Sequence, residues 1–219
     1  MNAFERDGFA LVSAIFSPAE CRAIAGQIET MRCASAGTRR LLLQDGCRSL
    51  AVKIRQHPAL SSLLSGMVAV QCTFFEKSAS RNWLVAVHQD LSIPVAKRIE
   101  HPALQGWSVK EDQLYVQAPV EVLQQLIAVR IHLDSCGAED GPLRLVPGSH
   151  LQGLVTAEDA ANARRQETVC VADAGSALLM RPLLLHSSSK SSGTSQRRVL
   201  HYLFAPSALP LGLCWSDTV

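Results

Sequence analysis

SALLMRPLLLH at residues 176–186, followed by RRVLHYLFA at residues 197–205, decides the fold class of this chain. Both runs are short and dominated by leucine, valine and other apolar residues, and a polar stretch rich in serine separates them. Short apolar runs bounded by turn-forming residues predict β-strands. Further runs of this kind lie at residues 69–77, 83–90, 126–134, 141–147 and 167–173. The chain is therefore predicted to be mainly β.

Helical signals lie mostly on the N-terminal side of these strands. SPAE at residues 17–20 combines an N-cap serine, a proline at the first helical position and a glutamate three residues after the serine. This capping box predicts a helix that continues to about residue 32. Residues 57–67 predict a second helix, and residues 156–166 predict a surface helix capped by Thr156. Helices followed by many short strands favour a β-sandwich or a closed barrel with helices packed outside.

Composition limits the class of protein. A length of 219 residues suits a single domain over residues 1–219, and 47% hydrophobic with 18% charged residues excludes a disordered chain. The net charge of +2 gives no support for binding nucleic acid or an anionic membrane. No apolar run is long enough to span a bilayer, and MNAFERDGF lacks the apolar core of a signal peptide. Seven scattered cysteines without a CxxC favour free thiols in a reducing cytoplasm.

VHQDLS at residues 87–92 places His88 and Asp90 two positions apart. Residues i and i+2 of a strand share one face, so this pair offers a nitrogen and an oxygen to one point in space. An isolated His-x-Asp is more often a histidine at the edge of the core beside a solvated aspartate. RIHLD repeats the spacing at His132 and Asp134, and spacing alone does not choose between the two pairs.

The segment between Asp90 and the strand near residue 126 is predicted to be a long loop of the kind that forms a lid or a binding loop. Its charges balance, so they do not indicate the sign of a substrate. Trp107 and Tyr115 either face a ligand or pack on the protein itself. His57, His101 and His201 match no partner pattern and are expected to be structural or on the surface.

Three features together carry a family resemblance. VHQDLS is followed by GPLRLVPGSH at residues 141–150, then by His186 at the end of an apolar run, with Arg197 eleven residues later. This pattern covers nearly the whole chain and resembles the phytanoyl-CoA dioxygenase family of iron(II)/2-oxoglutarate oxygenases. The resemblance implies a double-stranded β-helix (jelly roll) with N-terminal and inserted α-helices.

The resemblance also implies the roles of individual residues. His88, Asp90 and His186 would bind Fe(II), because two histidines and one carboxylate on one face of the metal leave positions open for 2-oxoglutarate and O2. Arg197 would bind the distal carboxylate of 2-oxoglutarate, since a guanidinium meets a carboxylate with two parallel hydrogen bonds and a lysine does not. Arg198, on the opposite face of the same strand, is the alternative.

Weaker matches indicate further contacts with the co-substrate. Four residues match family positions that contact or flank 2-oxoglutarate: Thr73, Arg130, Ser188 and Ser195. Family members often carry tryptophan at the position of Arg130, so this arginine could instead hold a substrate anion. RIHLD falls where the family has a strand without metal ligands, and Asp134 opens a run of turn formers. His150 lies in a predicted turn and is not expected to touch iron.

The function that the resemblance implies is a 2-oxoglutarate-dependent dioxygenase that hydroxylates an unactivated C–H bond of a small organic molecule. 2-Oxoglutarate would be converted to succinate and CO2. Halogenating relatives carry alanine or glycine in place of the ligating carboxylate, and this chain keeps Asp90, which favours hydroxylation. The alternative is a non-catalytic jelly-roll protein that holds a metal or a small acid as a binder or sensor. Nothing in the pattern identifies the substrate or the oligomeric state.

Overall fold

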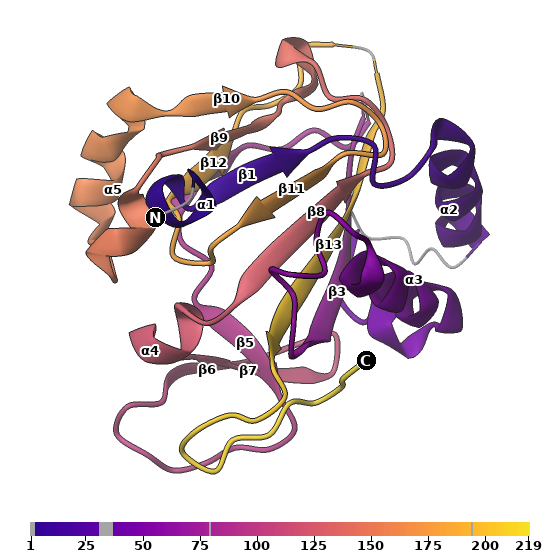
Figure 1. Ribbon diagram of the computed structural model, residues 1–219. Coiled ribbons are helices and arrows are strands. Elements are labelled where there is room, and N and C mark those ends of the chain that lie inside the picture. The colour runs from indigo at the N-terminus through magenta and orange to yellow at the C-terminus, as the bar shows by residue number, and fades with distance from the viewer. Residues whose placement is uncertain (1–2, 31–36, 79, 194) are drawn as a thin grey trace.

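The computed structural model describes residues 3–30, 37–78, 80–193 and 195–219, and two antiparallel sheets form its centre (Figure 1). The six-stranded sheet has the order β1 (Phe9–Val12), β11 (Ala177–Met180), β8 (Ile127–His132), β13 (Arg197–Pro206), β3 (Met67–Lys77) and β2 (Gly37–Thr38). The four-stranded sheet has the order β10 (Thr168–Cys170), β9 (Leu143–Leu145), β12 (His186–Ser188) and β4 (Val85–His88). The predicted mainly-β jelly roll is confirmed.

The central strand β13 is buried on both of its faces. His201 and Leu203 line a cavity between the two sheets. Leu200, Tyr202 and Phe204 pack instead into a core on the outer side of the six-stranded sheet. This alternation follows from the two-residue period of a strand. Residues of β13 therefore divide into a cavity-facing set and a core-facing set.

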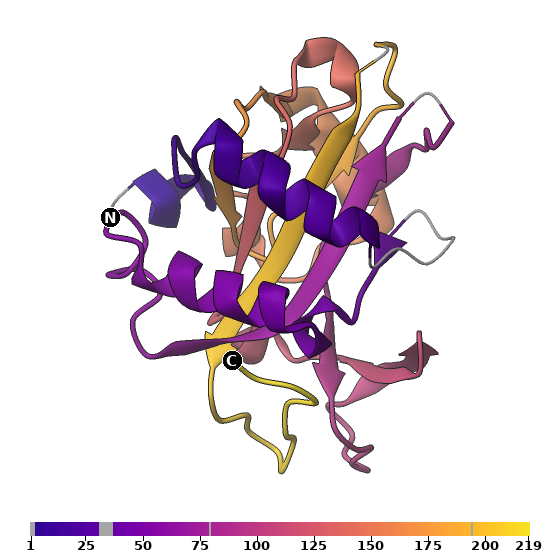
Figure 2. The ribbon, with the colours of Figure 1, turned by 90° about the vertical axis from the view of Figure 1, so that its right-hand side faces the viewer.

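Two helices cover the outer face of the six-stranded sheet, α2 (Pro18–Thr30) and α3 (Asp45–Gln56) (Figure 2). The predicted capping box of α2 is present: the backbone N–H of Ser17 donates to Glu20, and the N–H of Glu20 donates to the Ser17 hydroxyl. The part of this helix predicted beyond residue 30 lies outside the described residues.

The helix predicted at residues 57–67 is wrong, because those residues form turns and the helix α3 precedes them. Pro58 explains the boundary. A proline disfavours helical backbone in the residue before it, and His57 is extended with ψ 130°. The apolar residues Leu60 and Leu64 are still buried in the core beside α3.

The long loop predicted after Asp90 is also wrong, because it contains a three-stranded sheet of order β5 (Ser92–Val95), β7 (Gln113–Gln117) and β6 (Gln105–Lys110). The turn between β6 and β7 consists of Glu111 and Asp112, both with positive φ. Such turns usually carry asparagine and glycine, so Glu111 and Asp112 do not indicate a hairpin in the sequence.

The remaining elements are short. They are α1 (Ala3–Asp7), α4 (Val120–Leu123), α5 (Ala157–Ala163) and the 3-10 helices Leu41–Leu43, Ala138–Asp140, Ser149–Gln152 and Arg164–Gln166. Thr156 caps α5 as predicted, accepting a hydrogen bond from the backbone N–H of Asp159. Within the described ranges, no helix has both the length and the apolar character needed to cross a membrane. The six described cysteines are free thiols, and Cys33 lies outside the described residues.

Candidate metal centre

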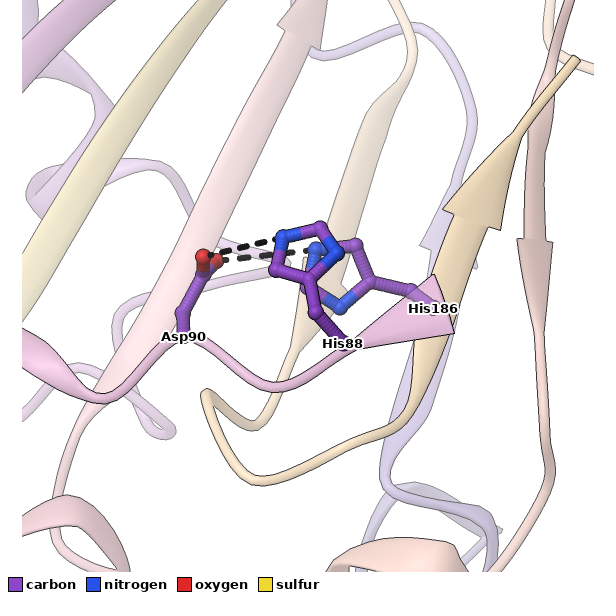
Figure 3. A group of neighbouring side chains, drawn as sticks. All are labelled: His88, Asp90 and His186. Atoms are coloured by element: carbon purple, nitrogen blue, oxygen red, sulfur yellow. Dashed lines mark ion pairs between the residues drawn. The ribbon is translucent and has the colours of Figure 1, made fainter. Parts of the chain in front are cut away.

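His88, Asp90 and His186 converge on one point between the ends of β4 and β12 (Figure 3). The two strands pair antiparallel with His88 directly opposite His186, and Asp90 follows β4 by two residues. Their ligand atoms all lie within 4.8 Å of one another. The Nε2 atoms of His88 and His186 lie 3.6 and 3.7 Å from the Asp90 carboxylate oxygens.

Backbone hydrogen bonds set the tautomer of both histidines. Nδ1 of His88 lies 2.9 Å from the carbonyl oxygen of Ala86, and Nδ1 of His186 lies 2.9 Å from that of Leu184. A carbonyl oxygen only accepts hydrogen bonds, so each Nδ1 carries the proton and donates it. The lone pair of each Nε2 is left facing Asp90, the orientation that a metal ligand needs.

Gln89 holds the two ligands beside it in place. Its amide nitrogen donates to the carbonyl oxygens of Gly153 and Leu183, at 2.8 and 2.7 Å. Neighbouring side chains on an extended segment point to opposite faces. Fixing Gln89 on one face therefore orients His88 and Asp90 toward the other.

The pKa shifts of Asp90 and His186 favour the forms that bind a divalent cation, whereas the shift of His88 favours its protonated form. Burial raises the pKa of Asp90, but the nearby charges and hydrogen-bonding groups of His186, His88 and His201 outweigh burial and hold this pKa well below its usual value. Burial lowers the pKa of His186, whereas the interaction with Asp90 raises that of His88. An ionised carboxylate and neutral histidines are the forms that bind a metal ion.

A cavity of about 450 Å³ opens beside the three side chains and is lined by both sheets and by the three-stranded sheet. This volume suits a small-molecule site. Its walls include eight aliphatic residues: Val85, Leu91, Ile93, Leu123, Leu126, Ala128, Leu143 and Leu203. Its cationic residues are Arg39, Lys110, Arg130 and Arg197, whereas Asp90 is the one carboxylate in its lining within the described chain. The cavity is therefore suited to anionic groups.

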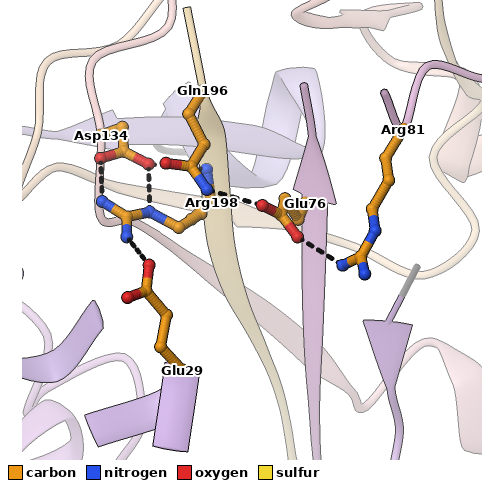
Figure 4. A network of polar contacts seen from close by, with 6 residues as sticks. All are labelled: Glu29, Glu76, Arg81, Asp134, Gln196 and Arg198. Atoms are coloured by element: carbon orange, nitrogen blue, oxygen red, sulfur yellow. Dashed lines mark hydrogen bonds and ion pairs between the residues drawn. The ribbon is translucent and has the colours of Figure 1, made fainter. Parts of the chain in front are cut away.

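Arg197 and Arg198 lie on opposite sides of β13. Arg197 lines the cavity with 4% of its surface exposed, one of its terminal nitrogens donates to the carbonyl oxygen of Gly141, and its Nε has no hydrogen-bond partner. Arg198 points away and binds the carboxylates of Asp134 and Glu29 (Figure 4). An incompletely bonded, buried guanidinium fits a carboxylate ligand, and Arg197 is the one that faces the cavity.

Three of the other predicted contact residues also line the cavity, namely Thr73, Arg130 and Ser188. A terminal nitrogen of Arg130 lies 3.0 Å from Nδ1 of His201, and its Nε has no hydrogen-bond partner. Ser195 differs, because it is exposed and donates a hydrogen bond to Asp140 away from the cavity lining.

The second His-x-Asp pair does not assemble a comparable site. His132 is buried on β8 and neither of its ring nitrogens has a hydrogen-bond partner. Asp134 lies beyond the end of β8 and accepts three hydrogen bonds from Arg198, two from the guanidinium and one from the backbone N–H. His150 contacts the carbonyl oxygen of Glu5, as suits a residue of a turn.

Sequence reasoning missed two residues near the cavity. His201 is buried and lines the cavity, although it was expected to be structural or on the surface. Its position four residues after Arg197 on one strand was the available signal, because both residues then share a face. Lys77 is 1% exposed and lies opposite Arg197 on the neighbouring strand. No pairing pattern in the sequence indicates this contact.

The residues present fit a ferrous ion and 2-oxoglutarate. Two histidines and one carboxylate on one side of a metal site are the donor set of non-haem iron(II) oxygenases, and the cavity supplies cations for a dicarboxylate. A jelly roll with this centre defines the class of iron-dependent oxygenases. The sequence profile of phytanoyl-CoA dioxygenase (PhyH) matches residues 4–199, so the chain belongs to this family. It is an enzyme dependent on iron and 2-oxoglutarate.

Solved structures with the same fold share little sequence with this chain. HygX from Streptomyces hygroscopicus, with nickel and 2-oxoglutarate bound, is 13% identical (TM-score 0.67, 93% of this chain and 84% of HygX covered). AviO1 from Streptomyces viridochromogenes Tue57 is 21% identical (TM-score 0.65, 95% of this chain and 94% of AviO1 covered). The epimerase SnoN, in complex with Fe3+, alpha ketoglutarate and nogalamycin RO, is 16% identical (TM-score 0.68, 96% of this chain and 88% of SnoN covered). No curated protein matches the chain in sequence.

Proposed function

We propose that the chain hydroxylates an unactivated C–H bond of a small organic molecule. One oxygen atom of O2 would enter the product and the other would enter succinate, with 2-oxoglutarate losing CO2. The observation that carries this proposal is the convergence of His88, Asp90 and His186 within 4.8 Å at a cavity that also contains Arg197. A binder of small acids does not need both features.

Each polar residue has a distinct part in this proposal. His88 and His186 would bind iron through Nε2, and Asp90 would bind it through its carboxylate. Arg197 would hold the distal carboxylate of 2-oxoglutarate, because its buried guanidinium retains an unused donor. Ser188 would donate to the same carboxylate. Iron with 2-oxoglutarate and O2 supplies the oxidation of the C–H bond, and the protein supplies orientation.

The cavity walls support chemistry that must exclude water. Ala128 and Leu203 line the cavity from the six-stranded sheet, Leu126 lines it from the position just before β8, and Ile93 lines it from the three-stranded sheet. Apolar walls limit the water that could quench a reactive centre before the substrate is oxidised. The three-stranded sheet would therefore contact the substrate, because it lines the cavity and supplies none of the three candidate metal ligands.

Retention of Asp90 favours hydroxylation over halogenation, because the carboxylate would occupy the position on iron that a halide needs. The roles of Thr73 and Arg130 as further contacts of 2-oxoglutarate belong to the same proposal, and so does that of Ser195 if the segment carrying it moves. We also propose a cytoplasmic location, supported by the free thiols of the described cysteines.

The test is turnover under isotopically labelled dioxygen. The protein is incubated with Fe(II), 2-oxoglutarate and a library of small metabolites, and succinate is measured in each reaction. The expected result is succinate formation that a substrate stimulates and a product that gains one labelled oxygen atom. Succinate formation together with a product that has an inverted stereocentre and no added oxygen would favour epimerisation, the activity named for SnoN. Absence of succinate under all conditions would favour a non-catalytic binder or sensor.

A further inference from the structure

Lys77 is a buried cation at the end of the cavity that contains Arg197. It is the last residue of β3 and pairs directly with Arg197, the first residue of β13. Only 1% of its surface is exposed. Lysine is rarely buried to this extent without a paired carboxylate, so the partners of this ammonium group need explanation.

The partners of Lys77 are two neutral oxygens and an aromatic ring. Its Nζ donates to the hydroxyl of Ser188 and to the carbonyl oxygen of Ser189, each at 2.5 Å, and it lies 5.5 Å from the centre of the Trp83 ring. The adjacent carboxylate, Glu76, points to the other face of β3. Burial, with the nearby charge of Arg197, lowers the pKa of Lys77 to about 8.

The neighbouring acid is already engaged. Glu76 accepts hydrogen bonds from Arg81 at 2.7 Å and from Gln196 at 2.6 Å (Figure 4). Its side chain therefore does not neutralise Lys77. Lys77 and Arg197 stand side by side with carbonyl and hydroxyl oxygens as partners, and these carry no net charge. The two neighbouring buried cations together attract an anion to the part of the cavity that Arg197 lines.

The contact with Lys77 fixes the direction of the Ser188 hydroxyl proton. An ammonium group has three donors and no acceptor, so the Ser188 oxygen must accept this hydrogen bond. The proton of the Ser188 hydroxyl is then directed elsewhere. Ser188 lines the cavity beside Arg197, and its hydroxyl is thereby prepared to donate to an acceptor inside it.

We propose that Lys77 is a positioning residue that makes Ser188 a hydrogen-bond donor to the distal carboxylate of 2-oxoglutarate, next to Arg197. This rests on the proposed function of the cavity. The consequence is selectivity for a dicarboxylic 2-oxo acid over a 2-oxo acid whose chain ends in a methyl group. Lys77 acts through Ser188, because it is not itself among the residues that line the cavity.

A purely structural role makes a different prediction. Lys77 connects the end of β3 to residues 188–189. Asn82, in the segment between β3 and β4, is joined to Ser191 by two hydrogen bonds of 2.7 Å. If Lys77 only fastens these segments, its replacement lowers thermal stability and disturbs binding of all 2-oxo acids alike. A positioning role affects the distal carboxylate selectively and depends on the presence of Ser188.

The experiment measures binding rather than turnover. Nickel-loaded wild-type protein and the variants Lys77→Met, Ser188→Ala and Lys77→Met/Ser188→Ala are titrated with 2-oxoglutarate by calorimetry. 2-Oxopentanoate, which has the same chain length without the distal carboxylate, is titrated in parallel. Lys53→Met, at an exposed lysine of α3, is the matched control. Melting temperatures of all five proteins show whether each one folds.

The expected result is that Lys77→Met weakens binding of 2-oxoglutarate about tenfold, the scale of a hydrogen bond to a charged group. The double variant should then bind within about threefold of Ser188→Ala alone. Binding of 2-oxopentanoate and the Lys53→Met control should be unchanged. The proposal is overturned if the losses of 2-oxoglutarate affinity in the two single variants multiply in the double variant. It is also overturned if Lys77→Met binds 2-oxoglutarate as tightly as the wild-type protein. A wild-type protein that binds nickel but not 2-oxoglutarate overturns the proposed function as well.

Discussion

His88-x-Asp90 and His132-x-Asp134 have the same spacing in the sequence and opposite outcomes in the structure. The first pair faces His186 across paired strands, and all three ligand atoms face one another. In the second pair the aspartate lies beyond the strand end, bound to Arg198. The spacing alone is therefore insufficient for a metal centre.

Two local features separate the pairs. His88 donates from Nδ1 to a backbone carbonyl, which leaves Nε2 free, whereas neither ring nitrogen of His132 has a hydrogen-bond partner. Burial, reinforced by the charges of Arg130 and Arg197, lowers the pKa of His132 to about 3. His132 is therefore neutral, but the positive charges of Arg130 and Arg197 would also repel a metal ion from it. The surroundings of a motif decide whether it becomes a site.

The largest expected effect is loss of turnover when a ligand of the first pair is removed. Replacing His88 or His186 with alanine should abolish iron-dependent succinate formation and weaken metal binding at least about 100-fold, more than loss of a residue that supports a ligand. His132→Ala should retain metal binding. Calorimetric titration with nickel measures the affinities, and the reverse pattern would assign the centre to the second pair.

A smaller effect is expected from the two arginines of β13. Arg197→Ala should raise the 2-oxoglutarate concentration needed for turnover at least about tenfold, which is roughly 1.4 kcal/mol. Arg198→Ala is the matched control, because its guanidinium binds Asp134 and Glu29 outside the cavity. Steady-state kinetics at varied 2-oxoglutarate gives both values. An effect of Arg198→Ala alone would contradict the assignment of Arg197.

Asp134 should contribute to stability and not to metal binding. Its carboxylate holds the half-buried Arg198 with two guanidinium hydrogen bonds of 2.8 Å. Asp134→Asn should therefore lower the free energy of unfolding by about 1–2 kcal/mol. Thermal and denaturant unfolding measure the loss, with nickel affinity measured on the same samples. A variant of normal stability that no longer binds metal would give Asp134 the role assigned here to Asp90.

The smallest effect is a pH dependence of the free energy of unfolding that Lys77 causes. The hydrogen-bond partners of Lys77 are neutral, whereas Arg198 binds two carboxylates. The pKa of Lys77 is lowered from 10.5 to about 8, so the folded protein binds this proton less tightly than the unfolded chain. Stability from this group is lost as the pH falls through about 8 and returns as it rises toward 10.5.

Wild-type protein should gain about 1 kcal/mol of unfolding free energy relative to Lys77→Met between pH 8 and pH 9. The difference between the two proteins removes the contribution of other titrating groups. Denaturant unfolding at both pH values measures it. A constant difference over this range would mean that Lys77 keeps an ordinary pKa.

Much of the fold could be predicted, because apolar runs and turn formers mark most of the strands and the family resemblance implies the jelly roll. The hairpin at residues 105–117 could not, because its turn uses Glu111 and Asp112 instead of the residues that usually adopt positive φ. The helix expected at residues 57–67 does not form, because Pro58 disfavours helical backbone at His57, where α3 ends.

The candidate site divides in the same way. The candidate metal ligands and Arg197 come from a family pattern of fixed spacing, and the structure brings them together at one cavity. Lys77 could not be predicted, since its contact with Ser188 joins residues 111 positions apart and depends on strand pairing. His201 was missed for a related reason. The spacing of four residues from Arg197 places His201 on the same face of the strand, but its burial follows from the central position of β13 in the sheet, which the spacing does not indicate.

The most direct test of the metal centre is anomalous diffraction from crystals grown with nickel or iron. The expected result is one metal peak per chain, bonded to Nε2 of His88, Nε2 of His186 and the carboxylate of Asp90. A peak beside His132 and Asp134, or a fully occupied metal elsewhere with none between these three side chains, would contradict the assignment.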